Sequence, residues 1–214
     1  TGQLPQSWNH ADPSTLAGEN DEMEKGGGYV LSALALNDVL FVYKNNSIWY
    51  MYPSNNQYIF NFKEFDEDLG LISSRAVASY EHKHYCVVNG DIVVNDGESL
   101  KSIATSTVRK WLFDNMSNDY FYLTQVVANA EFEEIWVCFA DTTSTGALNA
   151  AVVWNINSKT WSYRTLDNFA FLAPGIITED VVGVQDIIDS NVSILDNSTA
   201  VVDDLVYTPA RHSL

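Results

Sequence analysis

Short apolar runs separated by polar turns begin near Tyr29 and continue through most of the chain. Residues 36–43 form the first run, residues 44–47 are a polar turn, and residues 48–52 form the second run. β-Branched and aromatic residues dominate both runs, and such side chains fill a pleated, half-buried surface. The pattern predicts a strand, a turn and a second strand, with Trp49 near the start of the second strand.

The same pattern occurs twice more. Residues 84–88 lead into Asn89-Gly90, the strongest short hairpin signal, and residues 91–95 form the returning run. Residues 134–139 begin a third unit, in which a longer loop precedes the segment 152–163, VVWNINSKTWSY. The polar centre of this segment consists of turn-forming residues, so we predict a third hairpin there.

The three units recur at a nearly constant interval. Aligning Val39, Cys86 and Val137 gives spacings of about 47 and 51 residues. A repeat of roughly 40 to 50 residues that contains several short strands is typical of propeller blades. We therefore predict an all-β, β-propeller-like fold with several blades of short antiparallel strands and little helix. Four tryptophans are expected to pack between neighbouring blades: Trp49, Trp136, Trp154 and Trp161.

This pattern divides the chain into three parts. Residues 1–29 are expected to be an irregular N-terminal segment or linker, and residues 30–175 are expected to hold the three blade repeats. Residues 176–214 form either a degenerate fourth blade or an interaction arm. Only residues 102–115 have a weak amphipathic pattern that indicates a surface helix. Further strands are expected at residues 58–62, 76–80 and 120–127.

Composition agrees with a folded domain and adds a strong negative charge. The 214 residues are 46% hydrophobic and 13% aromatic, and they contain no apolar run long enough for a membrane span. The first residues also lack the basic and apolar regions of a signal peptide. Eleven Lys and Arg against 28 Asp and Glu give a formal charge of −17. The acids form either a solvated surface or a wall that faces an anionic molecule without gripping it, and tight DNA binding is not expected.

Candidate metal and phosphate sites are weak in this sequence. His82 and His84 have the spacing for one face of a strand, but a third ligand is missing, which favours surface histidines. Residues 66–70, DEDLG, lack the alternating acids of a calcium loop and are interpreted as a solvated acidic turn. The glycines at residues 26–28 neither follow a strand nor precede a clear helix, so we expect a flexible joint.

Candidate catalytic groups are equally weak. Residues 158–161, SKTW, lack the Asp and Gly of the sialidase-type box, and none of the common nucleophile or nucleotide motifs occurs. Cys86 and Cys138 lie in apolar runs and are expected to be reduced core residues. We predict that the chain is not an enzyme, and that it has no catalytic, cofactor-binding or metal-binding residues.

Taken in order, several short motifs resemble those of β-propeller-bearing tail proteins of bacteriophages. They cover residues 30–166: a strand with SIW at 47–49, a turn with GLISS at 70–74, the hairpin GDIVVNDG at 90–97, the basic-aromatic RKWLF at 109–113 and the closing WNINSKTWS at 154–162. The resemblance implies a structural virion protein of the tail nozzle or tail tube of short-tailed phages. Such proteins form ring-shaped homo-oligomers, usually hexamers, through which the genome passes.

The resemblance also implies partners and a location. The expected partners are further copies of the chain and other tail proteins such as the adaptor and fibres, in the tail of the virion. Genomic DNA would pass without specific binding, no membrane would be involved, and acidic walls would repel phosphate over about 8 to 10 Å. Two alternatives remain. The first is a kelch-like β-propeller that binds proteins, because Trp154 and Trp161 have the kelch hairpin spacing. The second is a propeller that binds or cleaves glycans.

Overall fold

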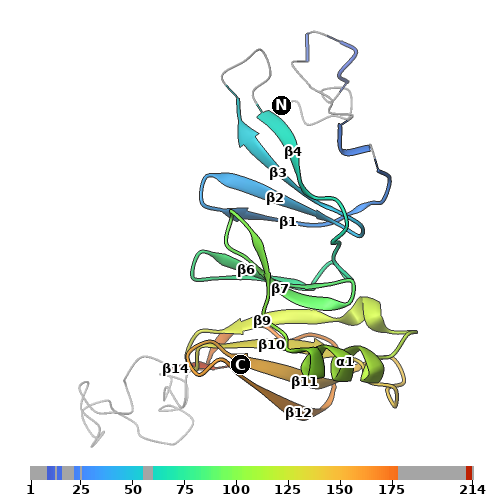
Figure 1. Cartoon of the computed structure of the whole chain (residues 1–214), viewed down its shortest axis with the longest axis vertical. Coiled ribbons are helices and arrows are strands. Elements are labelled where there is room, and N and C mark those ends of the chain that lie inside the picture. Colours follow the sequence, from blue (N-terminus) through green and yellow to red (C-terminus); the bar gives the residue numbers. More distant parts are fainter. Residues whose placement is uncertain are drawn as a thin grey trace, which may run out of the picture.

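Three four-stranded antiparallel sheets make up most of the protein. The structure, a computed structural model, describes residues 9–12, 14–15, 22–24, 26–54, 60–177 and 211–213. In each sheet the four strands follow one another in the chain, and each strand pairs with the next. Figure 1 shows the sheets one above another, with strands running across the view. The predicted all-β class is therefore correct. No helix in the described part of the chain is long and apolar enough to cross a membrane.

The first sheet contains the first predicted hairpin. Its strands are β1 (Val30–Leu36), β2 (Val39–Lys44), β3 (Ile48–Pro53) and β4 (Phe60–Asp66). Strands β2 and β3 pair from Tyr43↔Ile48 outward, so the polar residues between them form the turn that the sequence predicted. Strand β4 continues to Asp66, whose carboxylate accepts hydrogen bonds from the Asp68 and Leu69 amides. Residues 55–59, in which the expected strand at 58–62 begins, lie outside the described residues.

The second sheet contains the Asn89-Gly90 hairpin. Its strands are β5 (Val77–Tyr80), β6 (Lys83–Val88), β7 (Asp91–Asn95) and β8 (Leu100–Ser102). Strands β6 and β7 pair up to Val88↔Asp91, which confirms a two-residue turn at Asn89-Gly90. Gly90 has a φ of 84°, a left-handed conformation that glycine adopts without a steric penalty.

The third sheet contains the hairpin at residues 152–163. Its strands are β9 (Gln125–Asn129), β10 (Glu134–Phe139), β11 (Leu148–Asn155) and β12 (Thr160–Phe169). The pair Asn155↔Thr160 closes the hairpin, and Trp154 lies directly opposite Trp161. The Asn155 side chain accepts a hydrogen bond from the Ser158 amide, which is how a short polar residue stabilises such a turn.

The three sheets locate the repeat and correct its alignment. Their second strands begin at Val39, Lys83 and Glu134, which are 44 and 51 residues apart. The alignment of Cys86 with Val137 is right, because each is the fourth residue of its strand. The structural equivalent of both is Val42, so the sequence alignment of Val39 was wrong by three residues.

Other regular structure outside the sheets is short. Helix α1 (Ser106–Asn115) begins later than expected, because Ser102 belongs to β8 and the Thr105 side chain caps the helix by accepting a hydrogen bond from the Val108 amide. In the part of the chain that the structure describes, two 3-10 helices cover Glu22–Glu24 and Phe121–Leu123. Strand β13 (Gly175–Ile177) pairs with β14 (Arg211–Ser213) within the expected C-terminal blade or arm. Residues 178–210 and Leu214, the rest of that segment, lie outside the described residues.

The main core lies between the sheets. Phe41 and Tyr43 of β2, Val87 of β6 and Val137 of β10 are all buried in one cluster. The first strands β1 and β5 contact each other, and so do β5 and β9, with a parallel bridge between Arg75 and Gln125 just before β5 and at the start of β9. The first strands of successive sheets are therefore neighbours.

The four tryptophans divide into two groups. Trp154 and Trp161, with ring centres 5.1 Å apart, pack against the main core, and the Trp161 indole N–H donates to the Ile103 carbonyl of the second unit. These two lie between neighbouring sheets, as predicted. Trp136 belongs to a separate cluster on the other face of the third sheet. Trp49 lies opposite Val42 on the face of the first sheet that points away from the second.

Candidate functional site

The boundary between the first and second sheets holds the most developed polar arrangement in the described part of the chain. His84, the second residue of β6, is completely buried, so the expectation that it lies at the surface was wrong. Its Nε2 atom lies 3.1 Å from the Ala35 carbonyl oxygen, and its Nδ1 atom lies 2.8 Å from the Tyr43 hydroxyl. The side-chain nitrogen of Asn95 lies 3.1 Å from the same Tyr43 hydroxyl.

These contacts fix the positions of the protons. A carbonyl oxygen can only accept, so Nε2 carries the proton of the neutral imidazole and Nδ1 is the acceptor. The Tyr43 hydroxyl then donates to Nδ1 and accepts from the Asn95 side-chain N–H. The Asn95 side-chain oxygen in turn accepts from the Gly97 amide. Every polar atom of the network is satisfied without a charge, so the network joins two sheets and has no free group for catalysis.

Burial keeps all three titratable groups of this region neutral. Desolvation lowers the pKa of His84 below its usual value, and the hydrogen bond to Ala35 only partly opposes this effect. Desolvation also raises the pKa of Tyr43 well above its usual range. The neighbouring Cys86 thiol has its pKa raised to about 12 by burial, so it is a protonated thiol at neutral pH.

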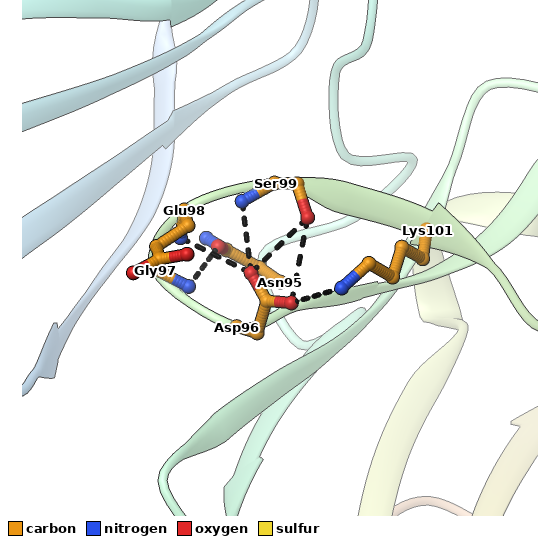
Figure 2. A network of polar contacts seen from close by, with 6 residues as sticks. All are labelled: Asn95, Asp96, Gly97, Glu98, Ser99 and Lys101. Atoms are coloured by element: carbon orange, nitrogen blue, oxygen red, sulfur yellow. Dashed lines mark hydrogen bonds and ion pairs between the residues drawn. The ribbon is translucent and has the colours of Figure 1, made fainter.

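The turn between β7 and β8 is shaped by Asp96 (Figure 2). Its carboxylate accepts hydrogen bonds from the Glu98 and Ser99 amides at 3.1 and 2.8 Å and pairs with the Lys101 ammonium at 2.5 Å. These contacts, first among them the one with Lys101, lower the pKa of Asp96. The Asp96 carboxylate is therefore fully engaged within the turn, and it holds Gly97 and Glu98 next to the first sheet.

Aromatic rings line the first sheet opposite this turn. The Phe65 ring stands at 86° to both Phe41 and Tyr50, with ring centres 5.1 and 6.1 Å apart. Phe65 takes this position because the pairing of β3 with β4 skips one residue. Ile48 is opposite Asp66 and Trp49 is opposite Glu64, which leaves Phe65 without a partner. Such bulges change the direction of a side chain.

A cleft of about 450 Å³ opens between these rings and the β7–β8 turn. Three aromatic side chains and Val39 provide its apolar lining, and Gly97 forms part of the opposite side. Its charged lining residues are Lys63, Glu64 and Glu98, all exposed to solvent. Among the described residues, none of these three charged groups has a hydrogen-bond or ion-pair partner for its side chain. No local sequence pattern indicates this cleft, because its residues come from three separate strands, β2, β3 and β4, and from the β7–β8 turn.

The weaker sequence candidates stay apart in the structure. His82 lies in the β5–β6 turn with a φ of 56° and is exposed, so the two histidines do not share a strand face. The described residues contain no group of three or more His, Cys, Asp or Glu side chains that could hold a metal ion. Ser158 lies in the β11–β12 turn, where its hydroxyl contacts Asn155 and Thr160.

Both cysteines are free, buried thiols, as expected, and burial raises the pKa of Cys138 to about 12. The glycines at 26–28 pack on the first sheet through contacts with the turn between β2 and β3. Gly28 approaches the Asn45 and Asn46 side chains, and the buried Lys44 ammonium donates to the Met23 carbonyl at 2.7 Å and to the Gly27 carbonyl. These glycines are therefore part of a packed contact, whereas the sequence predicted a flexible joint.

No protein-family model matches this sequence, and a search of curated proteins finds no match to it.

Proposed function

We propose that this chain is a structural component of a protein assembly, in which the three sheets are successive blades of a propeller-like ring. The observation that carries the proposal is the arrangement of the first strands. Each sheet begins with the strand that contacts the first strand of the next sheet, β1 with β5 and β5 with β9. A radial arrangement of four-stranded meanders places the first strands together at the centre.

The outward faces of the end sheets support assembly with further surfaces. On the first sheet, Leu40, Met51 and Phe62 form a row across three strands and are only half-buried. Contiguous apolar surface on a sheet is a feature of contact surfaces between proteins. The motif order described above resembles that of phage tail nozzle proteins, and the proposal accordingly places the assembly in a phage tail, as a ring around the path of the DNA.

The acidic residues have a definite place in this proposal. The first strands β1, β5 and β9 contain no Asp or Glu, so in the proposed ring the inner edges of the sheets would not provide the acidic wall that the charge suggested. The turns that follow these strands do carry acids, namely Asp38, Glu81, Glu131 and Glu133. These turns lie at the same end of the three sheets, on the left in Figure 1. In the proposed ring they would place negative charge around one mouth of the channel.

Imaging and mass measurement of the full-length protein test the proposal. Negative-stain images should show particles with rotational symmetry, and light scattering coupled to size-exclusion chromatography should give the mass of several chains. Antibodies raised against the protein should label one end of tailed particles from its source. A protein that stays monomeric at all concentrations and gives no ring in images would refute the assembly. Rings without labelling of any virion would refute the tail assignment alone.

A further inference from the structure

We propose that the cleft between the first sheet and the β7–β8 turn binds an arginine side chain presented by a partner protein. The cleft combines an aromatic corner with two carboxylates. Tyr50 and Phe65 are half-buried and meet at 86°, and the buried Phe41 contacts both rings. Glu64 and Glu98 approach the same space from the two sheets.

A guanidinium group fits this combination better than other groups. Its flat, delocalised face stacks on an aromatic ring, and its forked N–H groups pair with a carboxylate. Tyr50 and Phe65 offer ring surface for stacking. Glu64 and Glu98 offer carboxylate oxygens that make no hydrogen bond or ion pair with a described side chain, whereas the Asp96 carboxylate, in the same turn as Glu98, pairs with Lys101.

Charge supports the choice of a basic partner. The protein carries a formal charge of −17, so its field attracts cations towards the surface. Within the cleft two carboxylates outnumber the single ammonium of Lys63. Arginine residues are also among the commonest anchors of protein interfaces, where they fill pockets lined by aromatic rings. A neutral ligand such as a sugar would use the rings but would gain nothing from the excess negative charge.

The cleft is held in shape by contacts on both sides. On one side the bulge in β4 orients Phe65. On the other side Asp96 closes the β7–β8 turn, and the Asn95 side chain, which holds the Gly97 amide, is itself anchored to Tyr43 of the first sheet. The two walls are therefore connected through buried hydrogen bonds, and little ordering should be needed when an arginine binds.

Titration with small probes tests this inference. N-acetyl-arginine N-methylamide is added to the full-length, ¹⁵N-labelled protein, and N-acetyl-citrulline N-methylamide serves as the neutral control of nearly the same shape. The arginine probe should shift the amide resonances of Phe65, Gly97 and Glu98 with a dissociation constant on the order of millimolar, as expected for a single side chain. The citrulline probe should cause no such shifts.

Charge variants sharpen the test. Glu64→Gln with Glu98→Gln should weaken arginine binding about tenfold, since each exposed charge pair contributes a few-fold. Lys63→Gln should strengthen it about twofold, because a like charge is removed. Glu131→Gln removes the same charge from a distant turn and should leave binding unchanged. All of these side chains are exposed, so thermal melts should confirm that each variant keeps its fold.

Three outcomes would overturn the inference. One is equal binding of the citrulline probe, and a second is an equal loss of binding in the Glu131→Gln control. The third is the absence of shifts around the cleft with the arginine probe up to about 50 mM, well above the expected dissociation constant. Neutral saccharides that shift these resonances in place of arginine would assign the cleft to a different ligand. The test does not depend on the proposed ring, because a monomer can bind the probe and a ring can form without it.

Discussion

His84 lies in a neutral network that protonation would break. In the folded protein its Nδ1 atom accepts from Tyr43, so a proton on that atom would remove the acceptor and place a charge in the core. The nearby Tyr43 and Cys86 are neutral as well and cannot compensate for the charge. The folded state therefore binds this proton less readily than the unfolded chain does, in agreement with the lowered pKa of His84.

The sign of the pH effect follows directly. Below the ordinary histidine pKa of 6.5, the unfolded chain takes up a proton that the folded protein resists, so the free energy of unfolding falls as the pH falls. Above that value both states are neutral at this position and the effect disappears. Most carboxylates titrate at lower pH, which leaves the interval from about pH 7.5 to about pH 5.5 to the histidines.

We expect His84→Gln to remove this pH dependence. The variant should lose about 1–3 kcal/mol at pH 7.5, because glutamine reproduces the two hydrogen bonds imperfectly. Its free energy of unfolding, measured by urea denaturation, should then change little on going to about pH 5.5, whereas that of the original protein should fall. His82→Gln is the matched control, since His82 is exposed in the preceding turn and should keep the original slope. An unchanged slope in His84→Gln would contradict the assignment.

The burial of His84 was hidden from sequence analysis by a rule that works elsewhere. Structural and catalytic metal sites use three or four ligands, and because a third ligand is missing near His82 and His84, both are predicted to lie at the surface. Strand β6 is an inner strand of the middle sheet, so five of its six residues are buried. In such a strand a polar residue indicates a partner in the neighbouring sheet, and that partner, Tyr43, is 41 residues away.

At the scale of elements, the turn between β2 and β3 joins the first two sheets. The Leu71 amide donates to the Lys44 carbonyl, and the Asn89 side chain of the second sheet donates to the Asn45 carbonyl. The Gly70 carbonyl accepts from the Asn89 amide. The connection between the two sheets thus crosses directly over this turn, with backbone against backbone.

Gly70 is essential to this contact for a steric reason. A Cβ atom added there would lie 2.1 Å from the Asn45 carbonyl carbon and 2.3 Å from the Asn46 nitrogen, both of which are backbone atoms. We expect Gly70→Ala to lower the free energy of unfolding by about 2–3 kcal/mol, because the two sheets must separate slightly to admit the methyl group.

Chemical denaturation measures this effect, with Gly175→Ala as the control. A Cβ atom at Gly175 meets nothing within 4 Å, so that substitution should change the free energy of unfolding by less than about 0.5 kcal/mol. Equal stabilities of the two variants would show that the close approach at Gly70 does not contribute to the packing of the sheets.

Local signals explain which elements could be predicted. The hairpins at Asn89-Gly90 and at 155–160 have turn residues with their own hydrogen bonds or left-handed backbone, so short sequence segments determine them. The start of helix α1 was less certain, because Ser102, Thr105 and Ser106 are all possible caps. The pairing of Ser102 with Val93 in the neighbouring strand excludes Ser102, and the Thr105 hydroxyl, which accepts from the Val108 amide, identifies Thr105 as the cap.

At the scale of the whole molecule, the repeat could be predicted but the use of each face could not. Strand content and spacing come from local patterns, and they gave the correct all-β class with three units. The faces are decided by contacts between distant residues. Trp49 and Trp136 were expected between neighbouring sheets for their size alone, yet each lies on an outward face. The cleft has no local signal either, since Glu64 and Glu98 meet only through the packing of two sheets.

The outward face of the first sheet gives the most direct test of assembly. Leu40, Met51 and Phe62 lie side by side on β2, β3 and β4, and they remain half-buried in the isolated chain. If this face packs on a neighbouring chain, a charge there must be desolvated on assembly, which is costly without a partner of opposite sign. In the single chain the same charge can reach water.

We therefore expect Phe62→Glu to reduce the mass measured by light scattering to that of smaller species, while the circular dichroism spectrum and the melting temperature change little. Phe132→Glu is the control, because Phe132 is 60% exposed in the β9–β10 turn, outside the face in question. A variant that keeps the full assembly with a glutamate at residue 62 would show that the chains meet elsewhere.

If Phe62→Glu unfolds the chain, Met51→Lys, on the neighbouring strand, applies the same charge test. If either variant stays folded but no longer assembles, and the control still assembles, this face is a contact between chains. The reason is that a contact which excludes water tolerates an apolar side chain but strongly disfavours a charged one.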